Sequence, residues 1–307
     1  MISSIFKKSG VLSYLLSLAL LAVAVYSQGE TEGTLLLITF QKNITLFLLS
    51  ICMLAVDWIV KQRYWATQAN YHLLLFPFFI LAFPGETWGN WLLVYFLFLW
   101  VTFNYIVAID QSGQRIAKVF NAFFVFFVGV LFFPQGIIVL PFLWILLMTK
   151  NALNFQIFFI SLLPIIALYL LEVILVYFLP NNFLLPIFDF SNMGWSFPFR
   201  ESLRLNLWWG LMLGLSFFAL LKHYIDMGTR SASYGSGMIC LFIMTFMAII
   251  FGVLFQGQSS FSWTLFLMTL TALSTRLFEG IKREWLREGI FFVIIVLLLI
   301  GKQGLSF

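Results

Sequence analysis

The feature that most constrains this sequence is its series of long, unbroken apolar runs. The run IFFVIIVLLLI fills residues 290–300 without one polar side chain, and comparable runs recur along the whole chain. A transmembrane β-barrel would instead show segments of about ten residues in which apolar and polar side chains alternate. The runs therefore predict an all-α, polytopic membrane protein.

The composition leaves little of the chain for a soluble domain. The protein has 307 residues, of which 62% are hydrophobic and 9% are charged, whereas soluble domains average about 45–50% apolar and about 25% charged residues. At about 20 residues per span, the apolar residues can fill about nine or ten spans. We expect a single integral membrane domain over residues 1–307 and no appended globular enzyme.

Eleven segments are predicted to be helical, several of them short. With a cytoplasmic N-terminus, 13 Lys and Arg residues fall inside and 4 fall outside, namely Lys42, Arg200, Arg204 and Lys302. Because cytoplasmic loops carry an excess of Lys and Arg, this asymmetry supports the number of spans and the orientation. The predicted segments are 11–27, 44–60, 66–83, 90–108, 117–133, 137–149, 154–178, 205–221, 236–255, 261–275 and 289–300.

Two details of these spans stay open on the sequence alone. Lys7 and Lys8 precede an apolar run with small residues at signal-peptidase spacing, so a cleaved signal peptide is an alternative to a retained first helix. The segments 117–133 and 137–149 are short, because 13 residues of helix rise only about 20 Å against a core of about 30 Å. They can form two tilted spans or a re-entrant hairpin.

The longest predicted outer loop is rich in aromatic residues. It covers 179–204, and aromatic rings of this kind suit the headgroup layer of a membrane. The loop can simply seal the bundle, or it can act as a lid over a lipid-facing cavity.

Two ionisable residues within predicted spans are candidate substrate-binding residues. Glu172 has only apolar sequence neighbours, so it can face a water-filled cavity, stay protonated, pair with an Arg of the 179–204 loop or form a structural hydrogen bond. His72 can shuttle a proton and shares a helix face with Gln68. The other histidine, His223, is distant in sequence, which makes a histidine metal site unexpected.

Asp57 is a less informative intramembrane charge. Lys61 follows it by one helical turn near the predicted cytoplasmic surface, and this spacing predicts an ordinary i,i+4 ion pair.

Arg200 and Arg204 form a second candidate substrate-binding pair. They lie four residues apart before a predicted span, so their guanidinium groups can grip a phosphate or pyrophosphate in the outer headgroup zone. The alternatives are anchoring to anionic lipid headgroups and pairing with Glu201.

Acidic residues of the outer segments are the candidate catalytic groups. Glu30, Glu32 and Glu86 can act as bases, and Asp189 can contribute to substrate binding. The plainer interpretation is that outer loops need polar residues whatever their function. No cofactor is expected, although a divalent metal at these carboxylates stays open. The sequence has no nucleotide-phosphate or dinucleotide motif, which argues against ATP hydrolysis and nicotinamide chemistry.

Three segments carry a resemblance to a known group of proteins. The opening MISSIFKKSG, the segment NYHLLLFPFFILAFPG at 70–85 and RIAKVFNAFFVFFVGVLFFPQGIIVLPFLWILL at 115–147 resemble an uncharacterised polytopic inner-membrane family of Bacteroidota. This family has no established activity, so the resemblance implies a location and a topology but no chemistry.

The segment at 115–147 is also similar to the core of C-type glycosyltransferases and related polyprenyl-linked sugar polymerases. The shared features are a basic turn, a short helix, an FFP break and a second short helix. That resemblance implies an acidic residue in the first outer loop, which Glu30 or Glu32 matches by position only. The motif that surrounds this residue in the family is absent here.

Three functional hypotheses follow, and whether the protein is an enzyme stays open. The first and preferred one is an enzyme or carrier that handles a polyprenyl-phosphate-linked sugar or another lipid at the outer face of the membrane. The second is a non-catalytic subunit of a larger envelope assembly. The third is a transporter driven by protons or sodium, supported by Glu172. The expected partners are membrane lipids and, for the second hypothesis, other envelope membrane proteins; nucleic acid is not expected.

Overall fold

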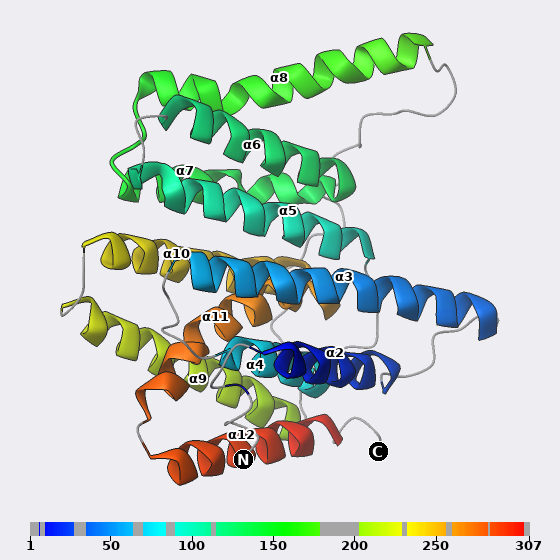
Figure 1. Ribbon diagram of the computed structural model, residues 1–307. Helices are drawn as coiled ribbons and strands as arrows, with labels where there is room; N and C mark the ends of the chain where they lie inside the picture. Colours follow the sequence, from blue (N-terminus) through cyan, green and yellow to red (C-terminus); the bar gives the residue numbers. More distant parts are fainter. Residues whose placement is uncertain are drawn as a thin grey trace. The chain divides into compact units, whose positions relative to one another are not determined.

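The computed structural model describes residues 6, 10–27, 35–63, 70–83, 90–111, 115–178, 203–228, 232–255, 260–281 and 283–303. Within these ranges the protein contains eleven α-helices, three short 3-10 helices and no strand (Figure 1). The predicted all-α class is therefore confirmed.

Each α-helix overlaps one of the predicted segments. The elements are α2 (Val11–Tyr26), α3 (Leu35–Gln62), α4 (Tyr71–Ala82), α5 (Asn90–Val107), η1 (Ala108–Gln111), α6 (Arg115–Phe132), η2 (Pro134–Val139), α7 (Leu140–Thr149), α8 (Phe155–Phe178), α9 (Leu203–Met227), α10 (Ala232–Phe255), η3 (Ser260–Trp263), α11 (Thr264–Gly280) and α12 (Glu284–Gln303).

Four helices of the described chain are long and apolar enough to cross a membrane. They cover Ile38–Gln62, Asn90–Val107, Arg115–Phe132 and Tyr234–Phe255. Other apolar helices are shorter; α4, for example, has 12 residues and rises only about 18 Å at 1.5 Å per residue. The architecture is that of a helical membrane protein, and the count of about eleven spans stays a prediction.

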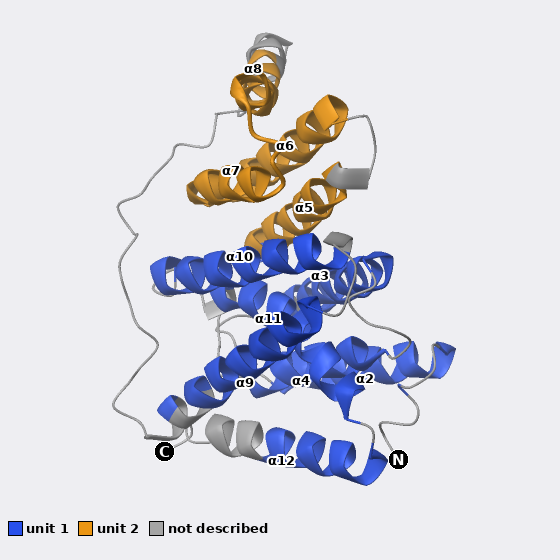
Figure 2. Ribbon diagram, turned by 90° about the vertical axis from the view of Figure 1, so that its left-hand side faces the viewer, with its two compact units in different colours: residues 1–90, 194–307 blue, residues 91–193 orange. Residues whose placement is uncertain are grey.

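The chain divides into two compact units. Unit 1 contains residues Met1–Asn90 and Gly194–Phe307, and unit 2 contains Trp91–Met193 (Figure 2). We describe each unit by itself.

The core of unit 1 is built around α4 and α11. α4 packs against α2, α3, α11 and α12, and α11 also packs against α3, α9 and α10. Ten of the twelve residues of α4 are buried, as expected for a helix that is apolar on every side. The threonine hydroxyls of α11 can be buried at little cost because they donate to carbonyl oxygens of their own helix. Thr271 Oγ1 lies 2.7 Å from the Leu267 carbonyl oxygen, and Thr275 Oγ1 lies 2.8 Å from that of Thr271.

Unit 2 contains the short helices that the sequence left ambiguous. α6 packs against α8, and η2 packs against α6 and α7. A Cβ at Gly136 in η2 would lie 2.5 Å from the ring of Tyr95, whose hydroxyl donates to the Gly136 carbonyl oxygen at 2.8 Å. Glycine therefore permits the close approach of η2 to α5. Whether this region spans the membrane or re-enters it stays a prediction.

Hydrogen bonds at both ends of α2 show that α2 and α3 run antiparallel. Tyr14, near the start of α2, donates to Asp57, near the end of α3. Tyr26, at the end of α2, donates to Asn43, near the start of α3. Such contacts are expected between consecutive helices that are joined by a short connection and run in opposite directions.

Candidate functional site

One of the eight predicted site residues has a described side chain, namely His72. Glu172 lies in α8 and Arg204 in α9, but their side chains lie outside the described part of the chain. The remaining predicted site residues, Glu30, Glu32, Glu86, Asp189 and Arg200, also lie outside the described residues. The roles assigned to these seven residues stay predictions.

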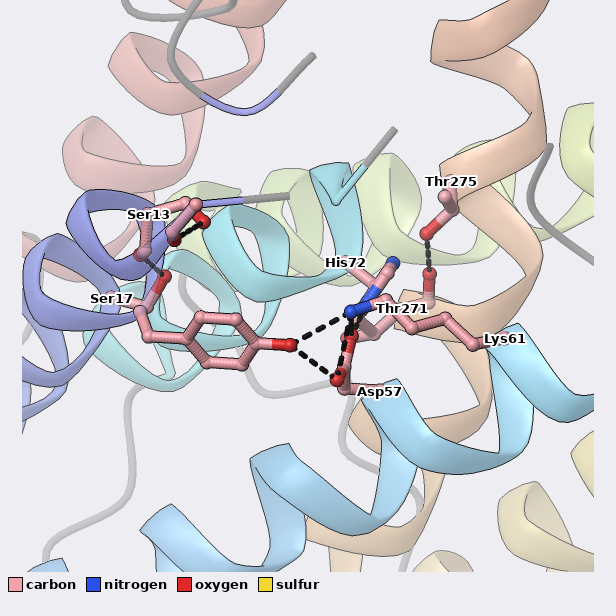
Figure 3. Close-up of polar contacts among 9 residues, drawn as sticks. Ser13, Ser17, Asp57, Lys61, His72, Thr271 and Thr275 are labelled. Carbon is pink, nitrogen blue, oxygen red and sulfur yellow. Dashed lines mark hydrogen bonds and ion pairs between the residues drawn. The ribbon is translucent and has the colours of Figure 1, made fainter. Parts of the chain in front are cut away.

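His72 contacts the carboxylate of Asp57 in the interior of unit 1. Its Nε2 lies 2.5 Å from Oδ1 of Asp57, and the exposed fractions of the two side chains are 0% and 10% (Figure 3). α4 begins at Tyr71, so His72 is in its first turn, whereas Asp57 lies near the end of α3. Donation by Nε2–H is the arrangement that suits an ionised carboxylate, which can only accept hydrogen bonds.

The same carboxylate has two further partners. The predicted ion pair with Lys61 is confirmed, with Nζ 2.7 Å from Oδ1 of Asp57. Tyr14 of α2 donates its hydroxyl to Oδ2 of Asp57 at 2.8 Å and accepts a hydrogen bond from Lys61 Nζ at 2.7 Å. We call these four residues, Tyr14, Asp57, Lys61 and His72, the Asp57 cluster.

The Asp57 cluster extends from the surface of unit 1 into its core. The side chain of Lys61 is 40% exposed, whereas that of His72 is fully buried. Asp57 lies between them and contacts both. The cluster therefore links an accessible ammonium group to a buried imidazole through a single carboxylate.

The second ring nitrogen of His72 has an unused hydrogen-bonding capacity. Among the described residues, Nδ1 of His72 is buried and has no hydrogen-bond partner. Leaving such an atom unsatisfied costs about 1–3 kcal/mol, and native interiors rarely do so without a bound water, ion or functional reason. A carboxylate that holds one imidazole nitrogen while the other is available is the usual arrangement for a histidine that takes up or delivers a proton.

The sequence did not indicate the contact between His72 and Asp57. The helical spacing predicted an ion pair of Asp57 with Lys61 alone. It also predicted that His72 shares a helix face with Gln68, which lies outside the described residues. One signal was available: α3 ends at Gln62 and α4 begins at Tyr71, so residues near these ends lie at the same end of a helical hairpin. No sequence pattern indicated the hydrogen bond from Tyr14 to Asp57, because the sequence does not show which helices α2 packs against.

A second polar cluster of unit 1 joins the end of α9 to α10 and α11. Asp226 accepts hydrogen bonds from Lys222 at 2.7 Å and from Nε of Arg276 at 3.3 Å. Nη1 of Arg276 also lies 2.9 Å from Oε2 of Glu279. Beside them, His223 contacts the Tyr234 hydroxyl at 2.9 Å and the Leu273 carbonyl oxygen at 3.0 Å. We call Lys222, His223, Asp226, Tyr234, Arg276 and Glu279 the Asp226 cluster.

Asp226 lies in the last turn of α9, beyond the predicted apolar span at 205–221. Burial by itself would raise the pKa of Asp226, but the hydrogen bonds from Lys222 and Arg276 outweigh burial and lower this pKa below its ordinary value. The Asp226 carboxylate is thereby held in its ionised form.

The described residues contain no group of three or more His, Cys, Asp or Glu side chains that could hold a metal ion. Neither Cys52 nor Cys240 forms a disulfide, and both are buried.

No protein-family model, no curated protein and no solved structure matches this chain.

Proposed function

We propose that this protein is a multi-pass membrane transporter that binds and releases a proton at the Asp57–His72 pair. One observation carries the proposal: a largely buried carboxylate contacts a fully buried imidazole whose other nitrogen has no partner among the described residues. Among the three hypotheses raised by the sequence, ion-coupled transport is the one that this geometry supports best.

Two physical arguments support proton binding at this pair. Ionisable groups within a membrane are costly, and those that persist commonly form proton relays or ion pathways. The ammonium of Lys61 already balances the carboxylate of Asp57, so protonation of His72 changes the net charge of the cluster by one unit. Histidine is the side chain that ordinarily changes charge near neutral pH, which suits it to this role.

The same proposal places the protein in a bacterial inner membrane with its N-terminus in the cytoplasm. The asymmetry of Lys and Arg supports this orientation, and it puts Lys61 at the cytoplasmic side. Single cysteines at Thr31 and Ser260 should then be labelled from outside, and one at Ser112 should not. The native Cys52 and Cys240 are buried and should not compete for the reagent. Protection of both outer sites would contradict this topology.

Proton binding can be tested on the purified protein with infrared difference spectra recorded across pH steps between about pH 5 and 8, where histidine ordinarily titrates. The wild-type protein should show signals of imidazole protonation that are lost in His72→Gln and altered in Asp57→Asn. The matched control is Asp226→Asn, which removes a carboxylate from the other cluster and should keep these signals. Spectra that are the same in the wild type and in both cluster variants would overturn the proposal, provided that circular dichroism shows all variants to be folded.

Lipid handling at the outer face of the membrane is the second candidate function, and the spacing of Arg200 and Arg204 favours it. Charge-assisted hydrogen bonds contribute about 1.5–3 kcal/mol each, so replacing both residues with Gln should weaken the binding of a lipid phosphate at least about tenfold. Native mass spectrometry of retained phospholipid and polyprenyl phosphate measures this effect. Unchanged lipid retention together with a negative proton test would move the preference to the non-catalytic subunit.

A further inference from the structure

Three consecutive residues at the start of α4 have buried polar atoms without a hydrogen-bond partner among the described residues. Nδ2 of Asn70 and the hydroxyl of Tyr71 have no hydrogen-bond partner among the described residues, and the same is true of Nδ1 of His72. Each of the three residues is only 1% exposed. Three consecutive residues in this state are unexpected, since native proteins satisfy most of their buried polar atoms.

The position of Asn70 indicates what these atoms can bind. Asn70 is the N-cap residue of α4, yet its side chain makes no capping hydrogen bond. An N-cap side chain lies beside the N–H groups of the first turn, of which that of Leu73 donates to the Asn70 carbonyl oxygen at 3.0 Å. Because Nδ2 is a donor, it adds to the positive end of the helix dipole instead of neutralising it, and such a helix N-terminus favours an anion.

Positive charge is also present next to Tyr71. The guanidinium carbon of Arg287 lies 5.1 Å from the centroid of the Tyr71 ring, and Arg287 itself is buried. Three carboxylates, those of Glu279, Glu284 and Glu288, oppose this charge at Tyr71. Of these, Glu279 bonds to Arg276 at 2.9 Å, and Glu284 lies 3.8 Å from Arg287 with its side chain 60% exposed. The surroundings of the first turn therefore combine hydrogen-bond donors with a buried cation.

We propose that the first turn of α4 binds a phosphate group, with Asn70 Nδ2 and the Tyr71 hydroxyl as donors. A phosphate accepts several charge-assisted hydrogen bonds at once, which matches a helix N-terminus with two added donors. The inference deepens the proposed function and rests on it for one feature, the coupling to a proton. Protonation of His72 adds a positive charge to this turn, so the proton and the anion bind more tightly together than either does alone. The transported substrate is then an anion that carries a phosphate group, either soluble or a lipid headgroup.

Two variants of the full-length protein test the site. Asn70→Asp keeps a good N-cap residue but replaces a donor with a negative charge, so it should weaken phosphate binding by at least about a hundredfold. Tyr71→Phe removes one hydroxyl and should weaken binding by about tenfold, the effect expected for one charge-assisted hydrogen bond. The matched control is Trp263→Phe, which removes another buried donor without a partner among the described residues, at the start of α11, and should leave binding unchanged.

Two probes distinguish the source of the phosphate. Binding of inorganic phosphate to detergent-solubilised protein is measured by thermal shift, and binding of phosphatidic acid is measured in nanodiscs against phosphatidylcholine alone. Binding of inorganic phosphate that both variants weaken assigns a soluble anion, whereas binding of phosphatidic acid alone assigns a lipid headgroup. Absence of binding by both probes, or binding that Asn70→Asp does not weaken, overturns the inference.

The two proposals can fail separately. Asp57→Asn neutralises the carboxylate beside His72 but removes none of the proposed phosphate donors, so it should still bind phosphate. If the infrared signals do not depend on Asp57 while phosphate binding depends on Asn70, the proton proposal fails and the anion site stands. If the infrared signals depend on Asp57 while phosphate binding is absent, the anion site fails and proton binding stands.

Discussion

The Asp57 cluster and the Asp226 cluster have similar residues but differ in how completely their hydrogen bonds are satisfied. Each has an aspartate, a lysine four residues away on the same helix, a buried histidine and a tyrosine. Both ring nitrogens of His223 have partners, the Tyr234 hydroxyl and the Leu273 carbonyl oxygen. In His72, Nε2 contacts Asp57, whereas Nδ1 has no partner among the described residues.

This difference separates a structural role from a chemical one. His223 is held by both nitrogens in one orientation, so it can join α9 to α10 and α11 but has no free position for a ligand. Asp226 and Glu279 also face two cations, Lys222 and Arg276, and the four charges cancel. The Asp57 cluster contains one carboxylate, one lysine and a histidine whose proton changes the total charge. The number of histidine nitrogens that already have hydrogen-bond partners, more than the residue types, therefore distinguishes the cluster that can bind a proton or ligand from the one that cannot.

The largest expected effect on stability comes from removing the central carboxylate of each cluster. Asp57→Ala should lower the free energy of unfolding by about 3 kcal/mol, because it leaves the fully buried His72 without its acceptor and removes the acceptor of Tyr14. Asp226→Ala should cost only about 1 kcal/mol, because Arg276 keeps Glu279 and Lys222 can reach water. Equilibrium unfolding of both variants in mixed detergent micelles measures the difference.

Equal losses in these two aspartate variants would contradict the comparison. Asp57→Asn is the control for volume: it keeps the size of the side chain and should recover part of the loss by accepting a hydrogen bond from Tyr14. A cost of Asp226→Ala that exceeds the cost of Asp57→Ala would show that the Asp226 cluster is the more deeply desolvated of the two.

Removing a tyrosine hydroxyl should have a smaller effect that depends on whether the hydroxyl has a partner. Tyr234→Phe leaves Nδ1 of His223 without its neighbour and should cost about 1 kcal/mol. Tyr71→Phe removes a hydroxyl without a partner in the described structure and should change stability by less than about 0.5 kcal/mol. The free energies of unfolding of the two variants, measured without added phosphate, test this comparison. A large loss of stability in Tyr71→Phe would show that the Tyr71 hydroxyl has a hydrogen-bond partner even without phosphate.

The sequence predicted the helices well because their cause is local. Long apolar runs and the breaks between them determine where helices lie, and each α-helix of the described chain overlaps a predicted segment. The ion pair of Asp57 with Lys61 was also predictable, because both residues lie on one helix, one turn apart.

The contacts that define the candidate site were not predictable in the same way. Tyr14 and His72 reach Asp57 from two other helices, so their contacts depend on how α2 and α4 pack against α3. Packing angles and register come from the whole apolar core and leave no local pattern in the sequence. The lack of a partner for Nδ1 of His72 is even harder to predict from the sequence, because it depends on every neighbouring residue that could have formed a hydrogen bond with this atom.

The Asp226 cluster should also give a pH dependence on the acid side. Because the pKa of Asp226 is lower in the folded protein than in the unfolded chain, its carboxylate stabilises the fold above the unfolded value of about 3.9. This contribution is lost as the pH falls through the lower, folded value. The free energy of unfolding, measured between about pH 6 and pH 3, should therefore fall more steeply with decreasing pH in the wild type than in Asp226→Asn. Parallel curves would mean that Lys222 and Arg276 do not stabilise the ionised form.

The smallest expected effects come from the two lysines, and they test whether the clusters differ only at the histidine. Lys61 and Lys222 each pair with an aspartate four residues away, and their side chains are exposed to similar extents, 40% and 36%. Partly exposed pairs at this spacing contribute about 0.3–0.5 kcal/mol. After loss of the lysine, Asp57 keeps Tyr14 and His72, and Asp226 keeps Arg276. Lys61→Gln and Lys222→Gln should therefore cost about the same, less than about 1 kcal/mol each in unfolding experiments. A loss of several kcal/mol in Lys61→Gln alone would show that the buried Asp57–His72 pair requires the ammonium.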